Sequence, residues 1–264
     1  YHSKFLYNLL KDNYNIIYEE FAKIIDNNYS GYNLILVTQG LSPNSKIILD
    51  KFNIEETILF SSKTIDGIGQ NILLVEDKND DTLVRISGPV INFGIIYKSI
   101  NEIKENINFD DIYKLSKKNN ISNLNYNKVK SSQIIWICNS SIIDYMGEIS
   151  NKFMEVFYCF SGKVISYLEF SHGTYQSSLY HDNIIYILLP DELQELAENM
   201  LKKEMIEHIY KIESLGVSNK DFIKYEIYFS YVIDLILNNS DIDIDFTKWK
   251  GINTQKLLYN IKKN

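Results

Sequence analysis

Three charged residues at helical spacing form the first group in this sequence whose types could do chemistry. Glu148, Lys152 and Glu155 stand at positions i, i+4 and i+7, so on a helix their side chains share one face. Shielding a carboxyl group from water raises its pKa toward neutrality, so the group can act as a general acid or base. A lysine one turn away could stabilise developing negative charge or pair with the carboxylate. The same spacing is also typical of a solvated salt-bridging face, and the residues alone leave both interpretations open.

The turn at residues 38–45 has the side chains that a phosphate site needs. It reads Thr-Gln-Gly-Leu-Ser-Pro-Asn-Ser and follows an apolar run at residues 34–37. A helix that begins in this turn would add free N–H groups and the positive end of its dipole. The candidate phosphate-binding residues are Thr38, Gln39, Gly40, Ser42 and Ser45. The structural alternative is that Ser42 followed by Pro43 is an ordinary helix N-cap.

Short apolar runs alternate with amphipathic stretches along the whole chain. The predicted strands are residues 34–37, 57–60, 72–75, 134–137, 163–168, 184–189 and 208–212. The predicted helices are residues 46–52, 90–104, 143–160, 190–203 and 220–238. This alternation indicates an α/β fold with parallel sheets and right-handed crossovers. Because the pattern runs through two cycles, it predicts two similar domains, residues 1–120 and 121–264, joined through a polar stretch rich in Lys and Asn.

Composition excludes several classes of protein. The chain has 264 residues, 45% of them hydrophobic, and a net charge of −7, which argues against nucleic acid as a partner. No apolar run is long enough for a membrane span. Cys138 and Cys159 sit in apolar runs, which favours buried free thiols in a reducing compartment and therefore the cytoplasm. The four histidines are scattered without ligand spacing, so we expect no metal site, and no cofactor is expected either.

Several motifs stand in an order that is typical of one family. The Glu148, Lys152 and Glu155 spacing follows a predicted strand, and Glu-Phe-Ser-His-Gly occupies residues 169–173. Asp-Ile-Asp-Phe-Thr-Lys occupies residues 243–248 near the end of the chain. Together with the turn after the first strand, these motifs resemble double-SIS (sugar isomerase) proteins. The sequence is similar to the isomerase half of glucosamine-6-phosphate synthase and to its deglycase and isomerase relatives, and Tyr-His-Ser at residues 1–3 resembles the end of an earlier loop in that family.

The resemblance implies a fold, a ligand and an assembly. It implies two SIS domains, each a flavodoxin-like three-layer α/β/α sandwich with a mainly parallel sheet. The ligand would be a sugar phosphate or an amino-sugar phosphate. The assembly would be a homodimer with a shared active site, because in this family the loop that carries the histidine can reach into the partner subunit.

The resemblance also implies roles for single residues. Glu155 falls on the catalytic carboxylate, which would move a proton between C1 and C2 of an open-chain sugar. Lys152 would stabilise the oxygen that becomes negative, and His172 resembles the ring-opening acid/base. In the C-terminal tail, Lys248 and Lys250 could close over the substrate.

Some positions depart from the family pattern and keep other interpretations open. Val90 follows Gly-Pro where the family often has Glu, and Lys98 is one residue out of register with the family's lysine. The turn at residues 138–141 lacks the usual glycines. We therefore weigh an aldose–ketose isomerase or deaminase/deglycase against a non-catalytic sugar-phosphate sensor. An unrelated doubly wound nucleotide or flavin protein is the third interpretation, which the lack of Gly-x-Gly-x-x-Gly disfavours for dinucleotides.

Overall fold

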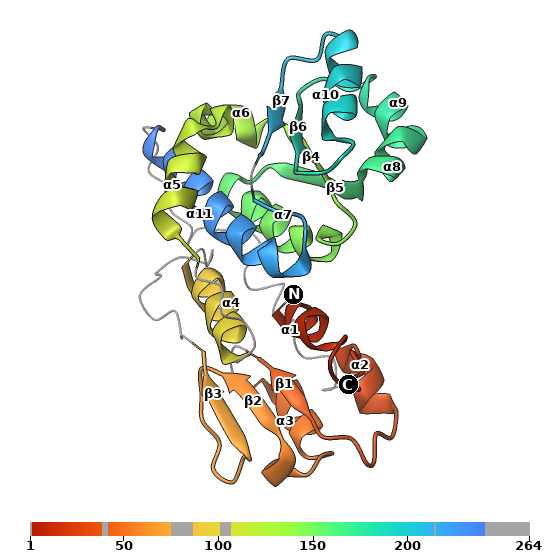
Figure 1. The fold of residues 1–264 in the computed structure, drawn as a ribbon, viewed down its shortest axis with the longest axis vertical. Coiled ribbons are helices and arrows are strands. Elements are labelled where there is room, and N and C mark those ends of the chain that lie inside the picture. Colours follow the sequence, from red (N-terminus) through yellow and green to blue (C-terminus); the bar gives the residue numbers. More distant parts are fainter. Residues whose placement is uncertain (1, 39–41, 75–86, 101–106, 214, 241–264) are drawn as a thin grey trace. The chain divides into compact units, whose positions relative to one another are not determined.

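The structure is a computed structural model that describes residues 2–38, 42–74, 87–100, 107–213 and 215–240 (Figure 1). The chain divides into two compact units that meet in sequence between Ser99 and Ile100. We call the described residues up to 99 the N-terminal unit and those from 100 onward the C-terminal unit. Each unit is built on a parallel sheet of its own.

A three-stranded sheet in the order β1-β2-β3 forms the centre of the N-terminal unit. The strands are β1 (Ile35–Val37), β2 (Ile58–Ser61) and β3 (Gln70–Leu73). The helices are α1 (His2–Leu10), α2 (Phe21–Asp26), α3 (Pro43–Leu49), the 3₁₀ turn η1 (Ile54–Glu56) and α4 (Ser87–Ser99). Buried Leu34, Ile48 and Leu49 form a hydrophobic cluster that ties the start of β1 to the end of α3. This cluster fixes the path of the chain on either side of the turn between β1 and α3.

A four-stranded sheet in the order β5-β4-β6-β7 forms the centre of the C-terminal unit. The strands are β4 (Gln133–Cys138), β5 (Phe160–Ser166), β6 (Ile184–Leu188) and β7 (Ile209–Lys211). The helices before β5 are α5 (Phe109–Lys118), η2 (Asn120–Asn123), α6 (Tyr126–Lys130) and α7 (Ile143–Phe157). Those after β5 are α8 (Tyr167–Glu169), η3 (Phe170–Thr174), α9 (Tyr175–Ser178), α10 (Gln194–Lys203), η4 (Asn219–Asp221) and α11 (Phe222–Asn238).

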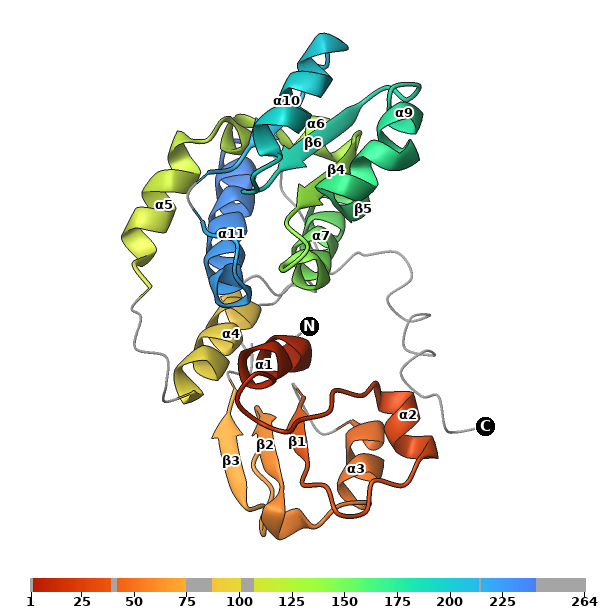
Figure 2. The same cartoon turned by 45° about the vertical axis from the view of Figure 1, so that its right-hand side comes forward.

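The side chains of the central strand β4 alternate between the two faces of this sheet, and both faces are buried. Trp136 is fully buried, with its ring centroid 5.1 Å from that of Phe153 on α7 and 5.2 Å from that of Phe229 on α11. Ile135 and Ile137 point to the other face, where they join a cluster that includes Leu201 of α10. Helices therefore cover both faces, as Figures 1 and 2 show for α7 and α11 on one side and α9 and α10 on the other. Burial on both faces explains why β4 and β6 read as continuous apolar runs.

The parallel α/β architecture that the sequence predicts is confirmed. All seven predicted strands are present, and the predicted helices coincide with α3, α4, α7, α10 and α11 with shifts at their ends. The helix expected to begin at Pro190 instead begins at Gln194, because the Asp191 carboxylate accepts a hydrogen bond from the Leu193 N–H in a preceding turn. Helix α1 was not predicted from the sequence, and His2 and Ser3 lie in its first turn instead of in a loop.

The segment before β4 packs with the C-terminal unit. Helix α5 contacts α11, and Asn119 Nδ2 donates a hydrogen bond to the Lys211 carbonyl at 2.7 Å. By its contacts this segment belongs to the C-terminal unit. The domain boundary predicted from the sequence, at residue 120, stays a prediction.

Two further expectations concern the thiols and the membrane. Cys138 and Cys159 are both buried and free, as predicted. Burial raises the pKa of the Cys159 thiol to about 12, so this thiol stays protonated at neutral pH. Among the described residues, no helix combines the length and the apolar character that crossing a bilayer requires.

Candidate functional site

The C-terminal sheet has a topological switch point between β4 and β6. Strand β5 lies on one side of β4, whereas β6 and β7 lie on the other. In open parallel sheets, ligands bind outside the carboxyl ends of the strands at such a point. Asn139 directly follows β4 and Asp191 follows β6, and the Asn139 Nδ2 donates a hydrogen bond to the Asp191 Oδ2 at 2.7 Å. We call these two residues the switch-point pair.

Local hydrogen bonds hold the switch-point pair in place. The Asn139 Oδ1 accepts from the Ser141 N–H at 3.0 Å, and the Asp191 Oδ1 accepts from the Leu193 N–H at 2.9 Å. Both side chains are half-buried, so they remain accessible at the carboxyl edge. Neither residue was predicted from the sequence: residues 138–141 stood out only for their missing glycines, and Asp191 was not among the candidates. An acidic residue two positions after an apolar strand was the available signal.

The Cys138 thiol and the Tyr167 phenol, beside the switch-point pair, are both neutral. Burial, followed by the negative charge of Asp191, raises the pKa of the Cys138 thiol well above its usual range. The same two causes raise the pKa of the Tyr167 phenol, whose hydroxyl donates to the Leu189 carbonyl. Cys138 therefore lacks the thiolate character that a nucleophile requires. The chemistry available here is hydrogen bonding by a carboxylate and an amide.

In the N-terminal unit, three hydroxyls gather after the carboxyl end of β1. The Ser45 Oγ lies 3.2 Å from the Thr38 Oγ1 and 3.0 Å from the Ser42 Oγ. We call these three residues the hydroxyl cluster. The Ser42 Oγ also accepts from the Ser45 N–H at 3.2 Å, so Ser42 caps α3 with Pro43 in the first helical position. The structure thus contains the cap and, around it, the group of hydroxyls that the sequence predicted together.

The charged face of α7 is divided between the interior and the surface. Glu155 is exposed, Glu148 is half-buried and Lys152 is buried. The surrounding protein displaces part of the hydration of the Glu155 carboxylate and raises its pKa, while the Lys152 ammonium opposes that shift. Burial and then the Glu226 carboxylate raise the pKa of Glu148. The carboxyl groups of Glu148 and Glu155 therefore hold their protons more tightly than free glutamate does.

Lys152 forms an ion pair with Glu226 of α11. Both side chains lie in the interior, and the second oxygen of Glu226, Oε1, has no hydrogen-bond partner among the described residues. From the sequence, Lys152 was expected to stabilise a substrate oxygen or to pair with Glu155, and Glu226 was not predicted as its partner. The available signal was a single carboxylate within the apolar stretch that begins α11.

His172 lies at a kink after β5. Its backbone leaves helical geometry with φ −101° and ψ 77°, and Gly173 follows with φ +92°, which favours glycine. The His172 side chain is exposed. Glu169, which begins the same motif, forms a capping box with Ser166, and hydrogen bonds from the Ser166 N–H and hydroxyl lower the pKa of its carboxyl group. Glu169 therefore serves the local backbone.

Glu155 lies toward the amino ends of the strands of the C-terminal sheet, whereas His172 lies toward their carboxyl ends. Helix α7 starts at the carboxyl edge with Ile143 and runs back toward the amino edge, so Glu155, twelve residues on, lies about 18 Å along the helix. His172 follows the carboxyl end of β5. Within this unit the structure does not bring the two predicted catalytic residues together, and among the described residues no hydrogen bond or ion pair joins them.

Four of the predicted site residues lie outside the described residues. They are Gln39 and Gly40 in the turn after β1, and Lys248 and Lys250 in the tail. Their predicted roles in binding the phosphate and in covering the substrate stay predictions.

Solved structures share this fold. The glucosamine-6-phosphate deaminase of Thermotoga maritima aligns with a TM-score of 0.62 and 10% identity over 90% of this chain and 81% of that chain. A "Putative sugar binding protein" from Salmonella typhimurium LT2 aligns with a TM-score of 0.53 and 12% identity over 83% of this chain and 76% of that chain. No protein-family model and no curated protein matches the chain.

These likenesses, at 10% and 12% identity, show a common fold and no more. The fold places the switch-point pair and the hydroxyl cluster where parallel α/β proteins bind ligands, outside the carboxyl ends of their strands. Whether a given side chain acts there depends on its own geometry. By that criterion the hydroxyl cluster and the switch-point pair are the better-formed groups, whereas Lys152 is buried in its ion pair with Glu226.

Proposed function

We propose that this chain binds a sugar phosphate or an amino-sugar phosphate, with the phosphate held at the hydroxyl cluster. The observation that carries the proposal is the arrangement of Thr38, Ser42 and Ser45, whose hydroxyl oxygens lie 3.0 and 3.2 Å apart beyond the end of β1. Hydroxyl hydrogens rotate, so the same groups that bond to one another can turn to donate to phosphate oxygens. The names of the two structures with this fold, which mention glucosamine 6-phosphate and sugar binding, support a phosphosugar as the ligand class.

Binding without turnover is the function that the geometry supports best. Lys152 is engaged by Glu226 in the interior, and Glu155 lies far from His172 within one unit. Phosphate binding at the hydroxyl cluster does not require Lys152, Glu155 and His172 to lie together. A phosphosugar sensor built from two SIS domains requires only a site for the phosphate and a change in the protein when that site fills.

An isomerase or deaminase/deglycase is the second candidate, and the raised pKa of the Glu155 carboxyl group favours it. A carboxyl group that titrates closer to neutral pH suits proton transfer between C1 and C2 of an open-chain sugar. In this candidate Lys152 stabilises the negative oxygen after leaving its ion pair. His172, exposed at the other edge, opens the sugar ring in the partner subunit of a homodimer, and Lys248 and Lys250 close over the substrate.

The test is a thermal-shift and calorimetric titration with glucosamine 6-phosphate, glucose 6-phosphate, fructose 6-phosphate and inorganic phosphate. We expect a phosphosugar to raise the Tm of the wild-type chain. Thr38→Val keeps the side-chain shape but removes the hydroxyl, and should weaken binding about tenfold. Thr64→Val, at an exposed position of the same unit, is the matched control and should bind like the wild type.

NMR of the ligand then separates the two candidates. A sugar phosphate that binds and stays unchanged supports the sensor, whereas its interconversion supports the enzyme. If no phosphosugar raises the Tm, or if Thr38→Val binds as tightly as Thr64→Val, the hydroxyl cluster is not the phosphate site.

A further inference from the structure

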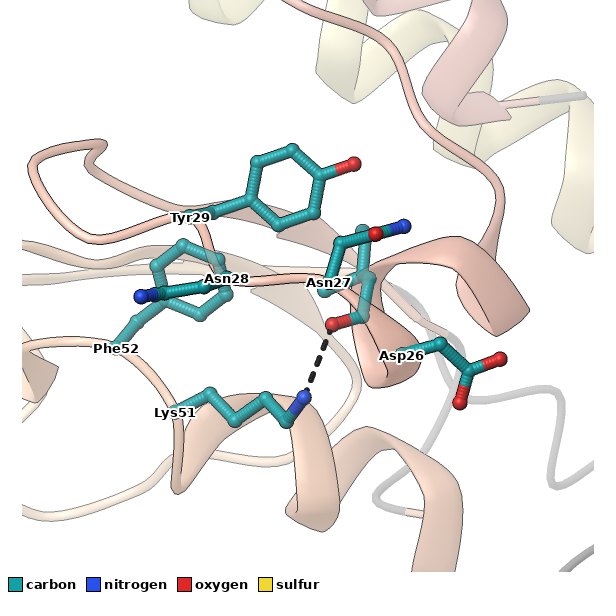
Figure 3. Close-up of a pocket in the computed structure, with 7 residues that line it drawn as sticks. Asp26, Asn27, Asn28, Tyr29, Lys51 and Phe52 are labelled. Carbon is teal, nitrogen blue, oxygen red and sulfur yellow. Dashed lines mark hydrogen bonds between the residues drawn. The ribbon is translucent and has the colours of Figure 1, made fainter.

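The N-terminal unit contains a cavity that the hydroxyl cluster does not use. Its volume is about 350 Å³, within the range of small-molecule sites. Its lining residues, shown in Figure 3, are Ile24, Asp26, Asn27, Asn28, Tyr29, Lys51 and Phe52. They come from the end of α2, the segment leading into β1 and the segment after α3. Because α3 runs from the carboxyl edge of the sheet back to the amino edge, the cavity lies at the edge opposite the hydroxyl cluster.

Two aromatic rings give this cavity an apolar surface. Phe52 packs against the buried cluster of Leu34, Ile48 and Leu49, so the core of the unit holds it in place. Tyr29 is half-buried, and its ring meets that of Tyr32 edge to face at 6.2 Å and 77°. The rings are therefore positioned before any ligand arrives. Ring faces of this kind attract the C–H groups of a ligand that is apolar on one side.

The carboxamides beside the rings offer a donor and an acceptor. The Asn28 Oδ1 accepts from the Ser30 N–H at 3.0 Å, and its Nδ2 has no partner in the part of the chain that the structure describes. Asn27 is arranged the other way: its Nδ2 donates to the Lys23 carbonyl at 2.9 Å, which leaves its Oδ1 as the acceptor. A hydroxyl both donates and accepts, so a ligand with several hydroxyls matches this pair.

The charge of the cavity does not select an anion. It has one ammonium group, that of Lys51, and one carboxylate, that of Asp26. The Lys51 Nζ donates to the Ile24 carbonyl at 3.2 Å, which is the dashed line in Figure 3. The charged lining residues thus carry one positive and one negative charge, which leaves no net charge to attract an anion. Charge balance therefore favours a neutral ligand.

We propose that this cavity binds a neutral saccharide, with one face of the sugar ring on Tyr29 or Phe52 and its hydroxyls on Asn27 and Asn28. The inference goes beyond the proposed phosphosugar site, because it uses other residues at the other edge of the sheet. A chain with both sites would bind a free sugar and a sugar phosphate independently.

The test is an NMR titration of ¹⁵N-labelled chain with glucose, galactose and N-acetylglucosamine. We expect amide shifts for residues 24–29, 51 and 52 with at least one of these sugars. Asn28→Asp keeps the oxygen that accepts from Ser30 but removes the Nδ2 donor, and Tyr29→Ala removes a ring. Each should raise the Kd about tenfold.

The matched controls are Asn33→Asp and Tyr14→Ala, at exposed positions of the same unit, and both should bind like the wild type. Absence of shifts with all three sugars, or shifts elsewhere only, overturns the proposal. So does a response of the cavity residues to inorganic phosphate or glucose 6-phosphate but not to glucose. Thr38→Val should leave the Kd for the neutral sugar unchanged while it weakens phosphosugar binding. The two titrations therefore test the neutral-sugar cavity and the phosphosugar site separately.

Discussion

The Lys152 ammonium on α7 pairs with the Glu226 carboxylate on α11 in the interior of the C-terminal unit, where the two side chains are 5% and 0% exposed. The Glu226 Oε1 has no hydrogen-bond partner among the described residues. The attraction between the two charges offsets part of the hydration that both lose on burial, so removing either one leaves the other charge buried and uncompensated.

Removing one partner of this pair should destabilise the fold strongly. We expect Glu226→Leu to lower the free energy of unfolding by about 3–5 kcal/mol, because the Lys152 charge is then buried alone. The double variant Lys152→Met with Glu226→Leu should recover most of that loss, since it leaves no buried charge. Urea unfolding of the wild type and of the single and double variants measures both effects. A double variant that is less stable than Glu226→Leu would show that the pair is not the source of the loss.

Glu148 should make the fold less stable as pH rises. Burial and the Glu226 carboxylate raise its pKa above the ordinary value of 4.5, so its contribution is fully present below pH 4.5 and is lost as pH rises through the folded-state pKa. We therefore expect Glu148→Gln to increase the free energy of unfolding near neutral pH but not at pH 4. Urea unfolding across this pH range is the measurement.

Glu169 provides a control whose contribution to the free energy of unfolding should change with pH in the opposite direction. Hydrogen bonds from Ser166 lower its pKa below 4.5, so its contribution is present above that pH and is lost as pH falls through the folded-state value. Glu169→Gln should therefore reduce stability near neutral pH and change it little in acid. Equal pH profiles for the Glu148→Gln and Glu169→Gln variants would contradict the origin given for both shifts.

Gly216 should not tolerate a side chain. Its φ is +85°, and a Cβ there would lie 2.4 Å from the Asp221 Oδ2. Asp221 cannot easily move, because it accepts hydrogen bonds from the Ser218 N–H at 3.0 Å and from the Lys224 Nζ at 2.7 Å. We expect Gly216→Ala to cost about 2–3 kcal/mol in thermal or urea unfolding.

The matched control for this clash is Gly67→Ala. Gly67 has a similar φ of +80°, but no atom lies within 4 Å of its Cβ position. The control should therefore show only the backbone strain, about 1 kcal/mol. Equal losses in the two variants would mean that the contact with Asp221 contributes nothing.

Glu155 gives the most direct separation of catalysis from binding. If the chain converts its phosphosugar, Glu155→Gln should reduce turnover at least about a hundredfold while the Kd changes little, because only the proton acceptor is lost. The wild-type pH–rate profile should show a carboxyl group titrating above 4.5 that the variant lacks. Exposed Glu192→Gln is the control for the loss of one charge. Turnover at the wild-type rate in Glu155→Gln would remove Glu155 as the base.

The sequence by itself was sufficient for the features that short segments encode. Continuous apolar runs located β4 and β6, since a strand buried on both faces has no polar side to show. The predicted helix began at residue 46, whereas α3 begins at Pro43, and the cap that Ser42 forms was available from the sequence as an alternative because a cap depends on a few consecutive residues. The hydroxyl cluster followed from the same turn, as its members lie within eight positions of one another.

Only the tertiary structure decided which distant side chains meet. Lys152 pairs with a residue 74 positions later, and Asn139 bonds to a residue 52 positions later. Helical spacing placed Glu148, Lys152 and Glu155 on one face, but the packing of α11 on α7 determined which of them is buried and which reaches the surface. Helical spacing gives the relative positions of residues on one helix but not which elements pack against that helix. The partner of a charged side chain is therefore set by the packing of elements far apart in sequence.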